Sequence, residues 1–109
     1  MPDANPQLLV IDVGNTNTVV GLFHGATLRA QWRLTTNREQ TADEYGILVR
    51  NLFALDGVEA GQISAVMIAS VVPPLNAVLD EMARKYFRDR KSTRLNSSHI
   101  QKSRMPSSA

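Results

Sequence analysis

Near the start of the chain stands the stretch Leu8-Leu9-Val10-Ile11-Asp12-Val13-Gly14-Asn15-Thr16-Asn17-Thr18. Its aliphatic run is short and β-branched towards its end, and the turn-forming pair Gly14-Asn15 follows Asp12. This pattern predicts a buried strand over residues 7–13 that stops at a tight turn.

Two further apolar segments follow this turn. Residues 19–23 resume the apolar pattern, and Gly25 marks a second turn. Residues 27–34 then alternate apolar and polar side chains, which is typical of a strand with one solvated face. The three segments together predict an antiparallel meander.

A helix, a strand and a second helix are predicted after the meander. Residues 41–44 read Thr-Ala-Asp-Glu, a capping box that begins a helix, and Gly57 is placed to end it. Residues 63–70 form a near-continuous apolar strand, and Pro73-Pro74 opens another helix. The predicted buried stripes are Tyr45, Leu48, Leu52 and Leu55 on the first helix, and Leu75, Val78, Leu79, Met82, Ala83 and Tyr86 on the second.

The order of these elements predicts the fold class. Strand, strand, strand, helix, strand, helix is the order of the first half of a ribonuclease-H-like α/β domain, whose fourth strand returns parallel through a helical crossover. We therefore predict an incomplete α/β lobe of this kind. Element order alone fixes no chemistry, because one fold hosts many functions.

Length and composition exclude several classes of protein. The 109 residues make one small domain at most, or part of a larger one, and no apolar run approaches the ~20 residues that cross a bilayer. The first residues lack a basic stretch and Asp12 interrupts the apolar run, so we predict no secretory signal and a cytoplasmic protein. Without cysteine, disulfides, thiolate metal sites and cysteine nucleophiles are excluded.

Residues 89–109 differ from the rest of the chain. Residues 1–88 carry seven basic and nine acidic groups, whereas residues 89–109 carry five and one, together with six of the eight serines. Residues 89–99 also back-translate into a common short-read sequencing adapter. We therefore predict that residues 1–88 are the native lobe and that residues 89–109 are a non-native or disordered basic tail. The alternative is a basic arm that binds nucleic acid by charge, but we predict no nucleic-acid and no membrane partner.

The turn after the first strand is the candidate site. A carboxylate followed by glycine, two amides and two hydroxyls suits a phosphate and its metal ion. Asp12 would hold a hydrated Mg²⁺, and Gly14 would let the backbone approach phosphate oxygens. The uncharged donors are Asn15, Thr16, Asn17 and Thr18. The alternative is a plain hairpin connector in which Asp12 caps the backbone. The loop matches neither a Walker A nor a Gly-x-Gly-x-x-Gly motif.

The segment between the third strand and the first helix has two interpretations. Arg33, Thr35, Thr36 and Arg38 lie close in sequence to Thr41, Asp43 and Glu44, as in a clamp for a substrate carboxylate. Helix capping and a solvated strand end explain most of the same residues.

Four segments in order resemble type III pantothenate kinase. They are residues 9–17, residues 21–23, residues 32–36 with 41–45, and residues 69–76. The resemblance covers about residues 7–88 and the N-terminal part of the family, which belongs to the superfamily of acetate kinase, sugar kinases, Hsp70 and actin. It implies a two-lobed ATPase of which this chain supplies the first lobe.

The resemblance implies transfer of a phosphoryl group from ATP to pantothenate, which gives 4'-phosphopantothenate and begins coenzyme A synthesis. The matching ATP phosphate loop comprises Asp12, Val13, Gly14, Asn15, Thr16, Asn17, Thr18 and Val19, with Asp12 as the metal ligand. The family's catalytic base lies in a Gly-Ala-Asp-Arg segment that has no counterpart in this chain. No catalytic residue is therefore assigned here, and we predict no kinase activity for this polypeptide.

The resemblance also implies a cofactor and an oligomeric state, and it leaves two alternative functions open. A full-length member requires a monovalent cation, potassium or ammonium, and forms a homodimer. Two alternatives stay open: an accessory transcriptional regulator of the same family, and a non-functional fragment that folds poorly because its partner lobe is missing.

Overall fold

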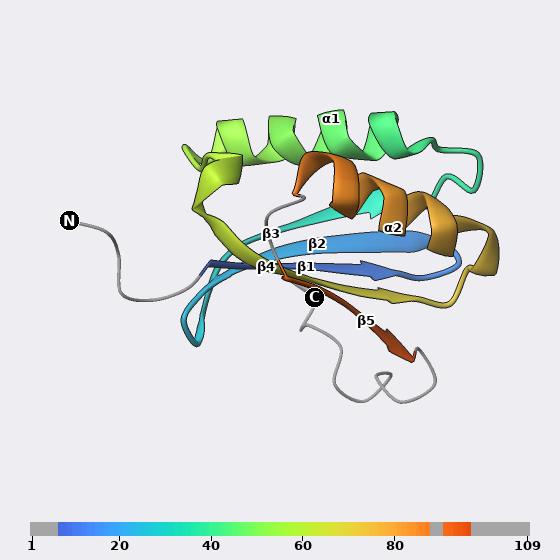
Figure 1. Cartoon of the computed structure of the whole chain (residues 1–109), viewed down its shortest axis with the longest axis horizontal. Helices are drawn as coiled ribbons and strands as arrows, with labels where there is room; N and C mark the ends of the chain where they lie inside the picture. Colours follow the sequence, from blue (N-terminus) through green and yellow to red (C-terminus); the bar gives the residue numbers. More distant parts are fainter. Residues whose placement is uncertain (1–6, 88–90, 97–109) are drawn as a thin grey trace.

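The computed structural model describes residues 7–87 and 91–96 (Figure 1). The elements are strands β1 (Gln7–Val13), β2 (Asn17–His24) and β3 (Thr27–Thr35), helix α1 (Ala42–Leu55), the 3₁₀ helix η1 (Ala60–Gln62), strand β4 (Ile63–Ser70), helix α2 (Pro73–Tyr86) and strand β5 (Lys91–Asn96). The predicted order of the first four strands and two helices is confirmed, and β1 has the predicted bounds.

The strands form one mixed sheet in the order β3-β2-β1-β4-β5. β1 pairs antiparallel with β2 and parallel with β4, so that Ile11 lies opposite Val20 on one side and Ile68 on the other. β2 and β3 complete the meander, and α1 supplies the crossover between β3 and β4. The predicted α/β class and the parallel return of the fourth strand through a helical crossover are confirmed.

Both helices cover the same face of the sheet (Figure 1). The core between the layers includes Leu9, Ile11, Val20, Leu22, Ile68, Tyr45, Phe53, Leu75, Leu79 and Met82, each at most 2% exposed. Phe53 packs against Trp32 and Phe87, with 6.2 Å between ring centroids in each pair. The helix layer thus holds β1, the strand that carries the candidate loop.

The predicted buried stripe of α1 needs a correction. Leu55 is 81% exposed, and Leu48 and Leu52 are only partly buried. Val49 and Phe53 are buried instead, because a helical spacing of four from Tyr45 directs these side chains at the sheet. For α2, the prediction is confirmed for Leu75, Leu79, Met82 and Ala83, while Val78 and Tyr86 are partly buried.

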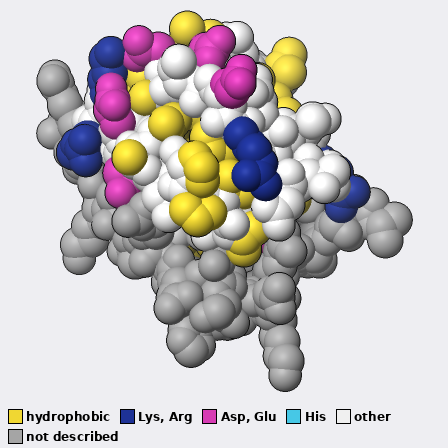
Figure 2. Space-filling model, turned by 90° about the vertical axis from the view of Figure 1, so that its right-hand side faces the viewer, with side chains coloured by type: hydrophobic (Ala, Val, Ile, Leu, Met, Phe, Trp, Pro, Cys, Tyr) yellow, Lys and Arg dark blue, Asp and Glu magenta, His cyan; other side chains and the backbone are white. Residues whose placement is uncertain are grey.

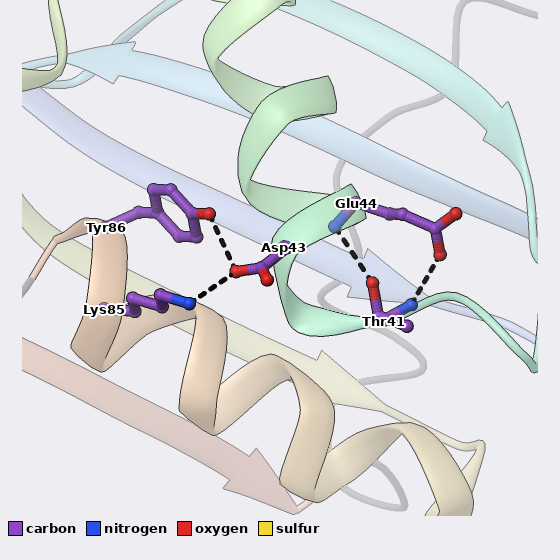
Figure 3. A network of polar contacts seen from close by, with 5 residues as sticks. All are labelled: Thr41, Asp43, Glu44, Lys85 and Tyr86. Carbon is purple, nitrogen blue, oxygen red and sulfur yellow. Dashed lines mark hydrogen bonds and ion pairs between the residues drawn. The ribbon is translucent and has the colours of Figure 1, made fainter.

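The two helices meet at a close contact that Figure 3 shows from nearby. The Tyr86 ring packs directly on Gly46, where any Cβ atom would overlap it. Asp43 Oδ1 accepts hydrogen bonds from Lys85 Nζ at 2.7 Å and from Tyr86 Oη at 2.8 Å. The bonds from Lys85 and Tyr86 favour the charged carboxylate and so lower the pKa of Asp43. The same bonds favour the protonated, donating forms of Lys85 and Tyr86 and so raise the pKa values of both.

The predicted capping box at the start of α1 is confirmed (Figure 3). Thr41 Oγ1 accepts from the Glu44 amide at 3.2 Å, and Glu44 Oε1 accepts from the Thr41 amide at 2.8 Å. The box fixes where α1 begins and therefore where the preceding connection from β3 ends.

Strand β5 falls inside the predicted tail. Lys91–Asn96 pair in parallel with residues 65–70 of β4, so the disorder expected of the tail does not apply to these six residues. Their predicted non-native origin stays a prediction, and the remaining tail residues lie outside the described part of the chain. No helix within the described residues is long and apolar enough to span a bilayer.

Candidate functional site

The candidate loop is the hairpin connection between β1 and β2. Val13 and Thr18 form the last strand pair, and the Gly14 amide donates to the Asn17 carbonyl at 2.9 Å to close the turn. The predicted alternative of a hairpin connector is thus an accurate description of the backbone. Hairpin geometry does not exclude ligand binding, because the chemistry depends on which groups the turn leaves exposed.

The loop lies where the carboxyl ends of β1 and β4 meet. Val13 pairs with Ser70, and the Val13 carbonyl accepts from the Val71 amide at 3.0 Å. Figure 2 looks onto this edge, where basic, acidic and hydrophobic side chains are all exposed. Ligands of open α/β sheets bind outside the carboxyl ends of parallel strands, so the loop occupies the ligand-binding edge of this architecture.

Burial divides the eight predicted site residues into two groups. Asn15, Thr16 and Asn17 are exposed. Asp12 is 6% exposed, and the buried remainder are Val13, Gly14, Thr18 and Val19. Three side chains of the loop are therefore open to a ligand from solvent, while the buried members other than Asp12 shape the turn. The binding role of all eight stays a prediction.

Asp12 is the one carboxylate within the loop sequence from Asp12 to Val19. Ile11 and Val13 face the core, so strand alternation places the Asp12 side chain on the other face of the sheet. Within the described residues there is no group of three or more acidic, histidine or cysteine side chains that would enclose a metal. A single carboxylate suits Mg²⁺, which keeps several waters and takes its other ligands from substrate phosphates.

Thr36, which directly follows β3, is hydrogen-bonded to the loop. Its amide donates to the Thr16 carbonyl at 2.8 Å, and its hydroxyl donates to the Gly14 carbonyl at 2.7 Å. The Thr18 hydroxyl lies 2.8 Å from the Thr36 hydroxyl. Because the single Thr36 hydroxyl proton goes to Gly14, Thr18 must be the donor in this pair. The sequence left Thr36 with two interpretations, a substrate clamp or part of a solvated strand end, and its contacts make it a support for the loop.

Tyr45 lies beneath this network on α1. It is 2% exposed, and its hydroxyl oxygen has no hydrogen-bond partner within the described chain. Burial raises the pKa of Tyr45, and the nearby Thr18 hydroxyl offsets this rise in part. Tyr45 therefore stays neutral at physiological pH and supports the loop by packing.

A cavity of about 710 Å³ opens beside the loop, between β3 and α1. It is lined by residues 35–40 and Leu48. Arg38, on its rim, donates from Nη2 to the Asn15 Oδ1 atom at 3.0 Å. Sequence reasoning named Arg38 only as a member of a carboxylate clamp, and no sequence signal joins two residues this far apart.

The turn after β4 is held by its own serine. The Val72 amide donates to Ser70 Oγ at 3.0 Å, and Ser70 Oγ donates to the Val72 carbonyl at 3.2 Å. Pro73 and Pro74 then begin α2 without a side-chain cap. These contacts account for the turn without a ligand.

Comparison with known proteins identifies the family. Residues 8–106 match the family model described as type III pantothenate kinase. The chain belongs to the type III pantothenate kinase family. It is 58% identical over 85 residues to a type III pantothenate kinase of Anaeromyxobacter sp. (strain K), and 53% identical over 84 residues to that of Myxococcus xanthus.

The chain spans about a third of the length of these pantothenate kinases, while the alignments cover 78% and 77% of it. The family match runs to residue 106 and so includes most of the predicted tail, whereas the pairwise matches cover 84 or 85 residues. The boundary at residue 88 therefore stays a prediction.

Solved structures agree with the fold. A Bacteroides thetaiotaomicron protein with an actin-like ATPase fold superposes with a TM-score of 0.64 at 8% identity, over 94% of this chain and 37% of that one. YeaZ from Pseudomonas aeruginosa gives 0.60 at 18% identity, over 84% and 44%. At these identities the likeness supports the actin-like fold alone.

Proposed function

We propose that this chain supplies the ATP-phosphate-binding lobe of an enzyme that phosphorylates pantothenate to 4'-phosphopantothenate, the first step of coenzyme A synthesis. The observation that carries the proposal is the loop from Asp12 to Val19 at the carboxyl edge of an actin-like sheet, in a chain of the type III pantothenate kinase family. The donor set of the loop, one buried carboxylate and three exposed uncharged side chains, suits a metal-bound polyphosphate.

Each residue of the loop has a role in this proposal. Asp12 is the protein ligand for Mg²⁺, and Asn15, Thr16 and Asn17 donate hydrogen bonds to phosphate oxygens. Val13, Gly14, Thr18 and Val19 hold the turn in place. When bound, Mg²⁺ neutralises charge on the phosphates, and positioning supplies most of the remaining catalysis in phosphoryl transfer.

The rest of the reaction belongs to sequence beyond this lobe. The base that accepts the pantothenate hydroxyl proton, the monovalent potassium or ammonium site and the homodimer contact are expected there, by family resemblance. The proposal includes a cytoplasmic location and no nucleic-acid or membrane partner.

The test begins with the genomic DNA that continues the codon for Arg88. The full-length gene product is expected to contain a Gly-Ala-Asp-Arg segment and to consume ATP in the presence of pantothenate in a coupled assay. The 109-residue chain is expected to show no turnover above background. Asp12→Asn in the full-length product should abolish turnover, whereas Asp56→Asn, an exposed carboxylate at the end of α1, should not.

Two results would contradict the proposal. Turnover by the 109-residue chain would show that the catalytic groups lie within it. A full-length product that lacks the Gly-Ala-Asp-Arg segment and does not consume ATP would instead favour the accessory transcriptional regulator.

A further inference from the structure

The phosphate loop lacks a positive charge of its own. No lysine, arginine or histidine occurs between Asp12 and Val19, and Asp12 is itself acidic. A nucleoside triphosphate carries several negative charges at neutral pH, and phosphate sites commonly meet them with arginine or lysine as well as with metal. A positive charge at this loop must therefore come from another element of the chain.

Arg38 supplies that charge. Its Nη2 atom donates to Asn15 Oδ1 at 3.0 Å, at the exposed tip of the loop. Within residues 7–87 and 91–96, Arg29 forms an ion pair with Asp56, and Lys85 forms one with Asp43. In the same residues Arg38 forms no ion pair with a carboxylate. A neutral amide oxygen is a modest acceptor for a guanidinium, whose five donors match the paired oxygens of phosphate.

The backbone around Arg38 keeps its guanidinium near the loop. Two residues before it, Thr36 is bonded to the loop through both its amide and its hydroxyl. After it, the Glu39 amide donates to Asn37 Oδ1 at 3.0 Å and the Gln40 amide to the Asn37 carbonyl at 3.2 Å, closing a turn. The capping box at Thr41 then fixes the chain to α1. Arg38 thus lies on a short connection anchored at both ends.

We propose that Arg38 binds a phosphate group of a nucleoside triphosphate held by the loop. On binding, its guanidinium exchanges the Asn15 amide oxygen for phosphate oxygens, and Asn15 is released to donate to the ligand through its own NH₂ group. This inference rests on the proposed function, because it requires the loop to bind ATP. It assigns Arg38 to the phosphate, not to the carboxylate of pantothenate, since its contact is with the loop tip.

The test measures nucleotide affinity by isothermal titration calorimetry on the full-length gene product, with ATP and adenosine as probes in the presence of Mg²⁺, and pantothenate affinity is measured on the same variants. Arg38→Gln is expected to weaken ATP about 10- to 100-fold, the usual size of a lost charge-assisted contact, and to leave adenosine unchanged. Arg38→Lys keeps the charge but loses the forked donors of the guanidinium, so its ATP affinity is expected to lie between that of the wild type and that of Arg38→Gln. Arg50→Gln, which removes an exposed arginine on α1, is the matched control and should bind both probes as the wild type does.

Three results would overturn the inference and leave the proposed function standing. They are wild-type ATP affinity in Arg38→Gln, an equal loss for ATP and adenosine, and a loss confined to pantothenate. The last would make Arg38 a carboxylate clamp. Absence of ATP binding by the wild-type protein would overturn both proposals together.

Discussion

At the scale of single residues, the hydroxyl of Thr36 holds the loop and can be removed without changing side-chain shape. Thr36→Val leaves the Gly14 carbonyl without this donor and the Thr18 hydroxyl without its acceptor, in a partly buried place. An unsatisfied group of this kind costs about 1–3 kcal/mol, so the free energy of unfolding should fall by at least about 1 kcal/mol.

Urea unfolding of the chain measures this loss. Thr35→Val is the control, because Thr35 is the exposed neighbour on the same strand end and the change in side chain is identical. Equal midpoints for the two variants would show that the Thr36 hydroxyl does not hold the loop.

The residues of the site were predictable only where they are contiguous in sequence. The stretch from Asp12 to Val19 shows its carboxylate, glycine and donors in order, and the fold places them at the sheet edge. Thr36 and Arg38 reach the loop across 20 or more positions, through contacts at Gly14 and Asn15 that depend on the register of β2 with β3. No local pattern encodes such a register, so their roles required the structure.

At the scale of elements, strand positions followed from apolar runs and turns, because these reflect local preferences. The stripe of α1 was less predictable, since leucine occurs on two sides of the helix and only the packing decides which side is buried. Val49 and Phe53 face the sheet, while Leu55 faces solvent. The contact of Gly46 with Tyr86 on α2 left no signal in the sequence.

That contact makes a prediction for the pair of helices. Gly46→Ala should lower the free energy of unfolding by about 1–3 kcal/mol, because overlap with the Tyr86 ring outweighs the ~1 kcal/mol that alanine gains in a helix. In the Tyr86→Ala background the overlap is gone, so the same change should stabilise the protein. Thermal unfolding of the two single variants and the double variant measures the coupling. Additive effects would show that the two side chains do not meet.

At the scale of the whole molecule, both helices of the described residues lie on the same face of the sheet (Figure 1). Strand alternation turns Leu8 and Val10 of β1 and Met67 of β4 to the opposite face, and all three are partly exposed. Parallel sheets are normally covered on both faces, and β1, β4 and β5 of this mixed sheet run parallel. Because the chain spans about a third of its relatives' length, we predict that the 109-residue chain binds an environment-sensitive hydrophobic dye and that the full-length product does not.

Met67→Lys in the 109-residue chain should reduce the dye fluorescence, whereas Ser64→Lys, at an exposed position of the same strand, should leave it unchanged. Equal fluorescence from the 109-residue chain and the full-length product would show that the longer sequence does not cover this face.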